Sequence, residues 1–115
     1  MAKECEENLQ KIVAGFRDCR NAFTAIGVET RQLILLVLLE SDLSGIRVGE
    51  IAEKTHLTRP SVSHHLQILK EAGIVAMRRE GTKNYYYLSA DETQWKEISD
   101  VISLIYASVR HISKS

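Results

Sequence analysis

The chain has 115 residues, 44% of them hydrophobic, and carries equal numbers of basic and acidic side chains. This length suits one domain with a single core, and the composition excludes a disordered or fibrous chain. The longest apolar stretch, 33–39, is too short to span a bilayer, and the acidic N-terminus lacks the apolar core of a signal peptide. We therefore expect a single-domain cytoplasmic protein without a membrane partner.

Apolar stripes at helical spacing mark both ends of the chain. The first predicts a helix over about 4–26, with alternating spacings of three and four between Leu9, Ile12, Phe16, Cys19, Phe23 and Ile26. The second predicts a helix over about 92–113, with the same alternation through Trp95, Ile98, Ile102, Ile105, Val109 and Ile112. Two such stripes in a small domain favour a homodimer, and packing within one subunit is the alternative.

Between these ends, the segment 29–40 predicts a helix that is apolar on most sides, which we expect at the buried centre. The segment 48–73 then predicts a helix-turn-helix. Its second helix has an inward stripe of Val62, Leu66 and Leu69. Thr58 is placed to cap that helix, Pro60 is tolerated in its first turn, and Gly73 suits the left-handed residue that ends it. In a helix-turn-helix the second helix enters the DNA major groove.

The segment 74–88 predicts a β-hairpin. Residues 74–79 and the aromatic run 84–88 are typical of strands, and 80–83 form the loop, with Gly81 as its flexible residue. The fold class we expect is therefore mainly α with a small β-hairpin: a winged helix-turn-helix with N- and C-terminal dimerisation helices. The tyrosines at 85–87 favour packing within the hairpin over base stacking.

Basic residues are concentrated in the middle of the chain. The segment 54–84 holds six basic and two acidic side chains, so it carries a charge of +4 and the remainder carries −4. This distribution suits a protein that presents one basic face to phosphate. The alternative is scattered charge on a solvated surface.

The inward stripe of the second helix predicts which side chains face DNA. Ser61, His64 and Gln67 fall on the opposite side and Ser63 at the flank, where polar groups reach base edges or phosphate. Arg59 lies at the helix start, within reach of phosphate or guanine, and His65 points more toward the core. In the hairpin, Arg78, Arg79 and Lys83 are candidates for backbone or minor-groove contact. Strand alternation turns Arg78 and Arg79 to opposite sides. The alternative for the helix is an ordinary solvated face.

The run GIRVGEIAEKTHLTRPSVSHHLQILKEAGIVAMRREGTKNYYYL closely resembles the helix-turn-helix and wing of ArsR/SmtB-type transcriptional repressors. The segment VETRQLILLVLLE matches the helix that precedes them in that family. The resemblance covers about 28–88, and the terminal helices fit the family's dimer interface. It implies a homodimer that binds an inverted-repeat operator and is released by a small inducer. By position, it assigns DNA contact to Arg59, Ser61, Ser63 and His64.

The metal-binding positions of that family hold other residues here. The family's Cys-Val-Cys run corresponds to Arg47-Val48-Gly49, and arginine and glycine offer no ligand. Its second site, Asp-x-His with a later histidine, corresponds to Asp91-Glu92-Thr93 and Leu104, which leaves only the aspartate. We therefore expect no metal, no cofactor and an inducer of unknown kind, with His111 as a surface or interface residue.

Two cysteines, Cys5 and Cys19, leave a redox role open. In one continuous helix they would lie ~21 Å apart, too far for a disulfide within that helix. A bond between Cys5 of one subunit and Cys19 of its twin is conceivable if the helices run antiparallel, and the alternative is a buried and an end thiol without redox function. The other open alternative is a protein-interaction module that no longer reads DNA. No phosphate loop, carboxylate pair or activated nucleophile indicates an enzyme.

Overall fold

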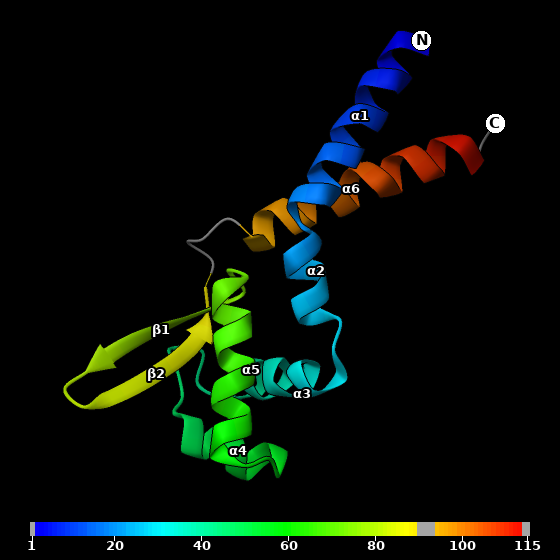
Figure 1. Cartoon of the computed structure of the whole chain (residues 1–115). Helices are drawn as coiled ribbons and strands as arrows, with labels where there is room; N and C mark the ends of the chain where they lie inside the picture. Colours follow the sequence, from blue (N-terminus) through cyan, green and yellow to red (C-terminus); the bar gives the residue numbers. More distant parts are fainter. Residues whose placement is uncertain (1, 90–93, 114–115) are drawn as a thin grey trace.

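The computed structural model of the chain describes the backbone of residues 2–89 and 94–113, and the side chains of 6–89 and 94–113. Figure 1 shows the first and last helices at one end of the molecule and the hairpin toward the other, with the central helices between them. Within the described ranges the elements are α1 (Ala2–Asp18), α2 (Arg20–Ile26), α3 (Glu29–Glu40), α4 (Val48–Thr55), α5 (Arg59–Glu71), β1 (Val75–Glu80), β2 (Lys83–Leu88) and α6 (Gln94–Ser113). The predicted winged helix-turn-helix is confirmed.

The predicted N-terminal helix over 4–26 is divided at Cys19. The Cys19 backbone N–H still donates to the carbonyl of Gly15 at 3.1 Å, but α1 ends at Asp18 and α2 begins at Arg20. The expectation of one continuous helix was therefore wrong. An apolar stripe at spacings of three and four continues through a bend, so periodicity alone does not reveal the division.

Helix α3 is less buried than its composition predicts. Ile34, Leu35 and Leu38 lie in the core, but the three leucines on its other side are exposed: Leu33, Leu36 and Leu39. The expectation that α3 lies at the buried centre is met by one face only, because the rest of the subunit does not cover the other. Over the described ranges no single helix has the length and apolar character to cross a membrane, whereas α2 and α3 together pass that test across an 82° bend.

The helix-turn-helix forms as the sequence predicts. The Thr58 hydroxyl accepts a hydrogen bond from the Ser61 backbone N–H at 3.2 Å and caps α5, with Pro60 in the first turn. Gly73 follows the last helical residues with a φ of 75°, in the left-handed region. One residue of the turn was not predicted: His56 ends α4 with a φ of 60°, a conformation that costs a non-glycine residue free energy.

The wing is an antiparallel hairpin in which Val75 pairs with Leu88 and Glu80 with Lys83. The strands therefore extend to 80 and from 83, and only Gly81 and Thr82 remain as a turn, shorter than the predicted loop over 80–83. Gly81 has a φ of 63°, as a tight hairpin turn requires. A backbone bridge between Ile46 and Tyr86 fixes the hairpin to the segment that leads into α4.

Helices α1 and α6 form two arms that extend away from the winged domain (Figure 1). They cross at Gly15, where an added Cβ atom would lie 2.7 Å from the Val101 side chain. The Trp95 indole N–H donates to the Ile74 carbonyl at 2.9 Å and anchors the start of α6. The molecule measures 57 × 25 × 21 Å with a radius of gyration of 17.4 Å. A compact domain of this length has a radius of about 13 Å, so the arms account for an elongated shape.

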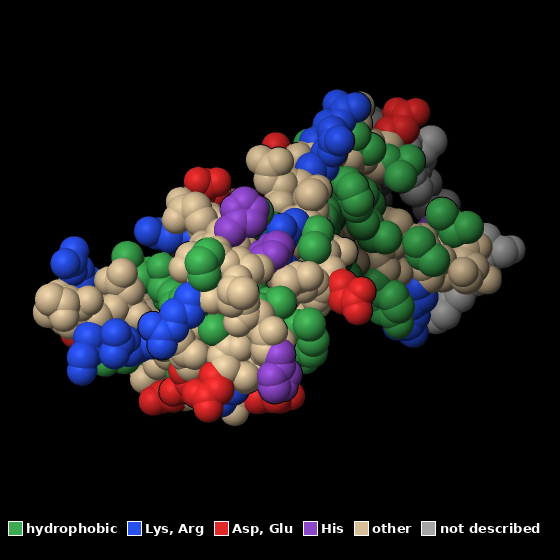
Figure 2. Space-filling view, turned by 60° about the horizontal axis from the view of Figure 1, so that its bottom comes forward, with side chains coloured by type: hydrophobic (Ala, Val, Ile, Leu, Met, Phe, Trp, Pro, Cys, Tyr) green, Lys and Arg blue, Asp and Glu red, His purple; other side chains and the backbone are tan. Residues whose placement is uncertain are grey.

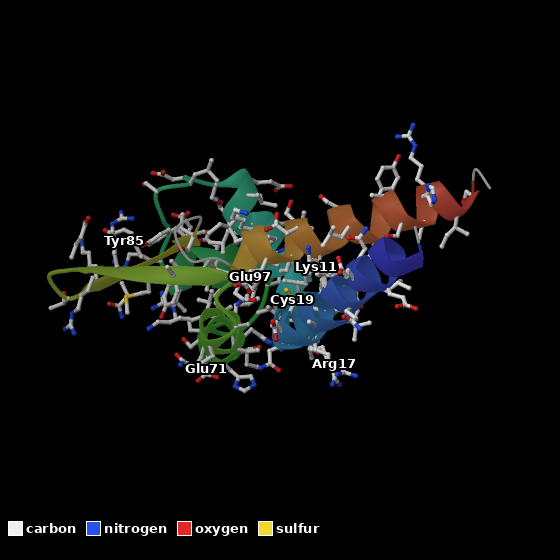
Figure 3. The ribbon with its side chains drawn as sticks, turned by 90° about the horizontal axis from the view of Figure 1, so that it is seen from above. Lys11, Arg17, Cys19, Glu71, Tyr85 and Glu97 are labelled. Atoms are coloured by element: carbon white, nitrogen blue, oxygen red, sulfur yellow. The ribbon has the colours of Figure 1, made fainter. Side chains whose placement is uncertain are left out.

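Cys19 lies in the core, between the end of α1 and the first turns of α6 (Figure 3). Burial raises the pKa of its thiol, and the nearby carboxylates of Glu97 and Asp18 raise it further. Because the thiolate is the reactive form, this environment suppresses the reactivity of Cys19. The side chain of Cys5 lies outside the described residues.

Replacing Thr58 with alanine should destabilise the protein by about 1 kcal/mol, because the Ser61 N–H loses its cap. The free energy of unfolding, measured by urea denaturation of T58A and wild type, tests this. The matched control is T82A, since Thr82 is an exposed residue of the wing turn. Equal losses in the two variants would contradict a capping role.

In a C5S variant, Cys19 should react with iodoacetamide on the order of a hundredfold more slowly in the native state than in urea, because it must first be exposed by local opening. Mass spectrometry at pH 7.5 measures the two rates. Comparable rates would show that the thiol is accessible in the folded protein.

Candidate nucleic-acid interface

Helix α5 has one buried and one exposed face. Val62, Leu66 and Leu69 are fully buried, which fixes the rotation of the helix about its own axis. The opposite face presents the polar side chains that the sequence predicts there, with Ser63, His64 and Gln67 exposed and Ser61 half-buried. These side chains come together on one surface as a consequence of apolar packing on the other side.

Two of the predicted contacts on α5 already have partners on the same helix or its cap. The Gln67 amide donates to the Glu71 carboxylate at 3.1 Å, one helical turn away. The backbone N–H of Ser61 is taken by Thr58, while its side chain is half-buried. For Gln67 to hydrogen-bond a base edge, it must exchange this exposed contact with Glu71, whereas Ser63 and His64 face solvent directly.

Arg59 extends from the start of α5 over the first turn of α4. A Cβ atom at Gly49 would lie 2.9 Å from a guanidinium nitrogen of Arg59, so glycine provides the space that this side chain occupies. Both residues line an open groove of about 800 Å³ between α4 and the wing, together with Arg47, Thr82 and Tyr85. Asp42, Glu50 and Glu53 line it as well, so the groove carries mixed charge. No pattern in the sequence indicates the contact between Arg59 and Gly49.

Arg78 is held by the wing itself. Its Nε donates to the Glu80 carboxylate at 3.1 Å, and its guanidinium lies 4.8 Å from the centre of the Tyr85 ring. These contacts turn the side chain toward the loop before α4, where it approaches Gly45. Arg78 therefore braces the hairpin against the helical domain.

Arg79 and Lys83 are the exposed cations of the wing. The Arg79 Nε donates to the carbonyl of Gly81 at 2.9 Å, which leaves its terminal nitrogens free within the described part of the chain. The side-chain ammonium of Lys83 has no hydrogen-bond or ion-pair partner among the described residues. Figure 2 shows Lys and Arg side chains gathered around the wing end of the molecule, with acidic side chains clustered separately. The alternation of Arg78 inward and Arg79 outward agrees with the prediction.

The site prediction did not include two further residues, which meet where α3 packs against α5. Arg31 on α3 is buried and approaches the ring of His65 on α5 at 3.4 Å. His65 is half-buried, as its position nearer the core predicts. In the sequence, the one indication of this contact is an arginine at the start of a helix that is mostly apolar.

The structure describes only some of the residues at the family's metal positions and at the two cysteine positions. Over the described residues, no three His, Cys, Asp or Glu side chains come together in a geometry that could hold a metal ion. Arg47 is exposed before α4, and Leu104 is half-buried on α6, while Asp91, Glu92 and Thr93 lie outside the described residues. Of the two cysteines, only the side chain of Cys19 is described, so the pairing of Cys5 with Cys19 stays a hypothesis.

The sequence matches the family described as bacterial regulatory protein, arsR family, over residues 29–76. Among curated relatives, an HTH-type transcriptional regulator of Methanocaldococcus jannaschii is 40% identical over 83 residues, which cover 72% of this chain and 85% of the relative. The transcriptional repressor SdpR of Bacillus subtilis is also 40% identical, over 64% of this chain and 79% of its own length. The transcriptional activator HlyU of Vibrio cholerae is 33% identical over 80% of this chain and 76% of HlyU.

Solved structures agree with this assignment. Reduced HlyU from Vibrio cholerae superimposes with a TM-score of 0.63 at 27% identity, over 76% of this chain and 90% of HlyU. NolR from Sinorhizobium fredii gives a TM-score of 0.55 at 31% identity, over 92% and 93% of the two chains. The homodimeric winged helix-turn-helix domain of a possible ArsR-family regulator from Mycobacterium bovis shares the fold, with a TM-score of 0.62 at 24% identity over 90% and 89%.

These relatives are transcriptional regulators rather than enzymes, and their similarity extends over the helix-turn-helix whose exposed polar face is described above. The chain belongs to the arsR family of transcriptional regulators and has its winged-helix DNA-binding fold.

Proposed function

We propose that this protein is a homodimeric repressor that binds an inverted-repeat operator through α5 and the wing. The observation that carries the proposal is the exposed polar face of α5, held outward by a fully buried stripe and flanked by the exposed cations of the wing. A helix of this kind fits the DNA major groove, and cations beside it fit the phosphate backbone.

Within this interface we assign base reading to Ser63, His64 and Gln67, because they form the outermost part of α5. Arg59 and Ser61 lie at the helix start, where backbone phosphates approach, and Arg79 and Lys83 provide the wing contacts. Arg78 has an indirect role in this interface. Its contacts with Glu80 and Tyr85 orient the strand that carries Arg79.

The homodimer is supported by the apolar surface of the arms. Exposed apolar side chains occur on both arm helices: Leu9, Val13 and Phe16 on α1, and Ile102, Tyr106, Val109 and Ile112 on α6. A contiguous apolar face on helices that extend beyond the domain is typical of a protein–protein interface. A second copy offers the same face, so a two-fold dimer covers both at once. The related Mycobacterium bovis domain is described as homodimeric.

Two-fold symmetry determines the form of the operator. A symmetric dimer presents two copies of α5, which enter successive major grooves about 34 Å apart, so the DNA sequence has matching symmetry. The repressor assignment follows the relative SdpR, whereas HlyU is named as an activator, so the effect on transcription is part of the proposal. A regulator of chromosomal genes acts in the cytoplasm of a bacterial or archaeal cell.

We further propose that the inducer does not use the family's thiolate site on the first helix of the motif. Arg47 and Gly49 occupy those positions, and the guanidinium of Arg59 lies over Gly49. A cation at this place would meet positive charge instead of thiolate ligands.

A duplex selected by the wild-type protein from a randomised pool should bind in a gel shift with strong salt dependence. In H64A we expect an altered base preference, because we place the His64 ring in the DNA major groove. In K83Q all sequences should bind more weakly, and the slope of log K against log salt should fall by about 1 for each lost phosphate contact.

The charge-matched control is K11Q, since Lys11 lies on α1 at a distance from the wing (Figure 3). If no duplex were selected, DNA binding would be refuted, and the winged fold would then serve protein interaction. If K11Q and K83Q changed the salt dependence equally, the wing would have no specific part in binding.

The dimer predicts a solution mass of twice the 13.0 kDa chain. V109E should weaken the association by at least about tenfold, because it places a carboxylate in an apolar interface. Light scattering after gel filtration over a concentration series measures this. L43E is the matched control, since Leu43 is also an exposed hydrophobic residue but lies outside the arms. A monomeric wild type, or equal effects of both variants, would contradict the proposed interface.

A further inference from the structure

Arg31 is the one charged side chain that the described part of the chain buries, with 8% of its surface exposed. No carboxylate lies within ion-pair distance of it among the described residues. Its Nε instead donates to the Ala25 carbonyl at 2.7 Å, and Nη2 to the Thr24 carbonyl at 3.4 Å. These carbonyls belong to the last turn of α2, the negative end of that helix, and they compensate the buried charge.

The third nitrogen of the Arg31 guanidinium reaches α5. Nη1 lies 3.4 Å from Nδ1 of His65. Arginine keeps all its protons in proteins and has no acceptor, so Nδ1 must accept this hydrogen bond. An imidazole whose Nδ1 accepts is neutral and carries its proton on Nε2. Arg31 therefore selects one tautomer of His65 and fixes the plane of the ring.

The Nε2 atom of the half-buried His65 side chain is not fully enclosed by the protein. It has no hydrogen-bond partner among the described residues, and no buried side-chain nitrogen or oxygen in those residues lacks a partner. His65 also lies at the edge of the exposed face of α5, where its ring meets that of His64 at 5.5 Å between centroids. Figure 2 shows two neighbouring histidine side chains on this face of the molecule.

We propose that the Nε2–H group of His65 is a further contact to a DNA phosphate oxygen, and that Arg31 is the positioning residue that holds it for this role. The proposal rests on the DNA binding proposed above. His65 would then bind DNA as well as pack against α3, and Arg31 would support that contact although it lies away from the DNA-facing surface.

Phosphate is the partner that this geometry favours. His65 is half-buried at the flank of α5, behind the outermost residues, and the flanks of a recognition helix face the DNA backbone while its outer face meets base edges. A single N–H donor held in one direction suits a phosphate oxygen. Because the ring is held before DNA arrives, no rotamer or tautomer equilibrium opposes binding.

The electrostatic surroundings keep the ring neutral. Burial lowers the pKa of His65, and the charge of Arg31 and the neighbouring His64 lower it further. Arg31 from α3 and His64 from α5 are the titratable or charged groups that face the ring, while α2 contributes only the carbonyls that hold Arg31. The contact therefore operates at neutral pH without a positive charge on His65.

Two amide substitutions distinguish the roles of the two ring nitrogens. His65→Gln places an amide N–H near the position of Nε2 and keeps the outward donor. His65→Asn places its amide near Nδ1 and keeps only the partner of Arg31. With the selected duplex, we expect H65N, which lacks the outward donor, to bind about tenfold more weakly than wild type. H65Q keeps the donor but loses the acceptor that Arg31 holds, so its affinity should fall between those of H65N and wild type. Urea denaturation of both variants controls for folding.

Salt dependence identifies the kind of contact. A neutral donor releases no counterion, so H65N should weaken binding without changing the slope of log K against log salt, unlike K83Q. Arg31→Lys retains the charge but lacks the fork that spans Ala25 and His65. In R31K we therefore expect a mixture of His65 tautomers, read from the imidazole nitrogen shifts in NMR spectra, and weaker binding of all sequences.

The outcomes are distinguishable. Wild-type affinity in H65N, or a reduced salt slope in it, would overturn a neutral phosphate contact while leaving DNA binding by α5 in place. A charged His65 ring or an Nδ1–H tautomer in wild type at pH 7.5, or an unchanged tautomer and affinity in R31K, would overturn the positioning role of Arg31. If the wild type selected no DNA, both the proposed function and the phosphate contact would fail.

Discussion

The packing of one stripe on α5 is the constraint on which the interface depends. Val62, Leu66 and Leu69 are completely buried, so the helix cannot rotate without exposing all three. A rotation of one residue position, about 100°, would replace the outward polar groups with apolar ones. The specificity of a recognition helix is therefore determined by the side that never touches DNA. The Thr58 cap and Gly73 mark its two ends and fix how far it extends.

The arginines of this chain illustrate why net charge is a poor guide to DNA binding. Arg31 is compensated by helix carbonyls, Arg59 lies over Gly49, and Arg78 is held between Glu80 and Tyr85. Arg31 connects α2 with α5 and Arg59 spans α5 and α4, whereas Arg78 is held within the hairpin. These contacts use the planar fork and the stacking surface that lysine lacks. Arg79 and Lys83 on the wing remain exposed and available for long-range attraction of phosphate. A chain with no net charge thus retains a locally basic end (Figure 2).

Features set by local sequence could be predicted: the helix-turn-helix, its cap, the hairpin and the opposite directions of Arg78 and Arg79. Each depends on residues within one turn or one strand. The division at Cys19 could not, because the apolar stripe continues through the bend. Nor could the contacts of Arg59 with Gly49 and of Arg31 with His65, since they require elements separated in sequence to meet at a particular distance. The exposed leucines of α3 were missed because composition does not tell which face a small domain can cover.

The same long-range contacts connect the arms to the recognition helix. α1 continues through Cys19 into α2, the last carbonyls of α2 hold Arg31, and Arg31 holds His65 on α5. Apart from the bend at Cys19, every step in this series is a helix or a hydrogen bond. The exposed arms lie at one end of the path and the DNA-facing helix at the other. The contact that orients the His65 ring thus lies at the end of a continuous series of contacts from α1 and is separate from the residues assigned to base reading.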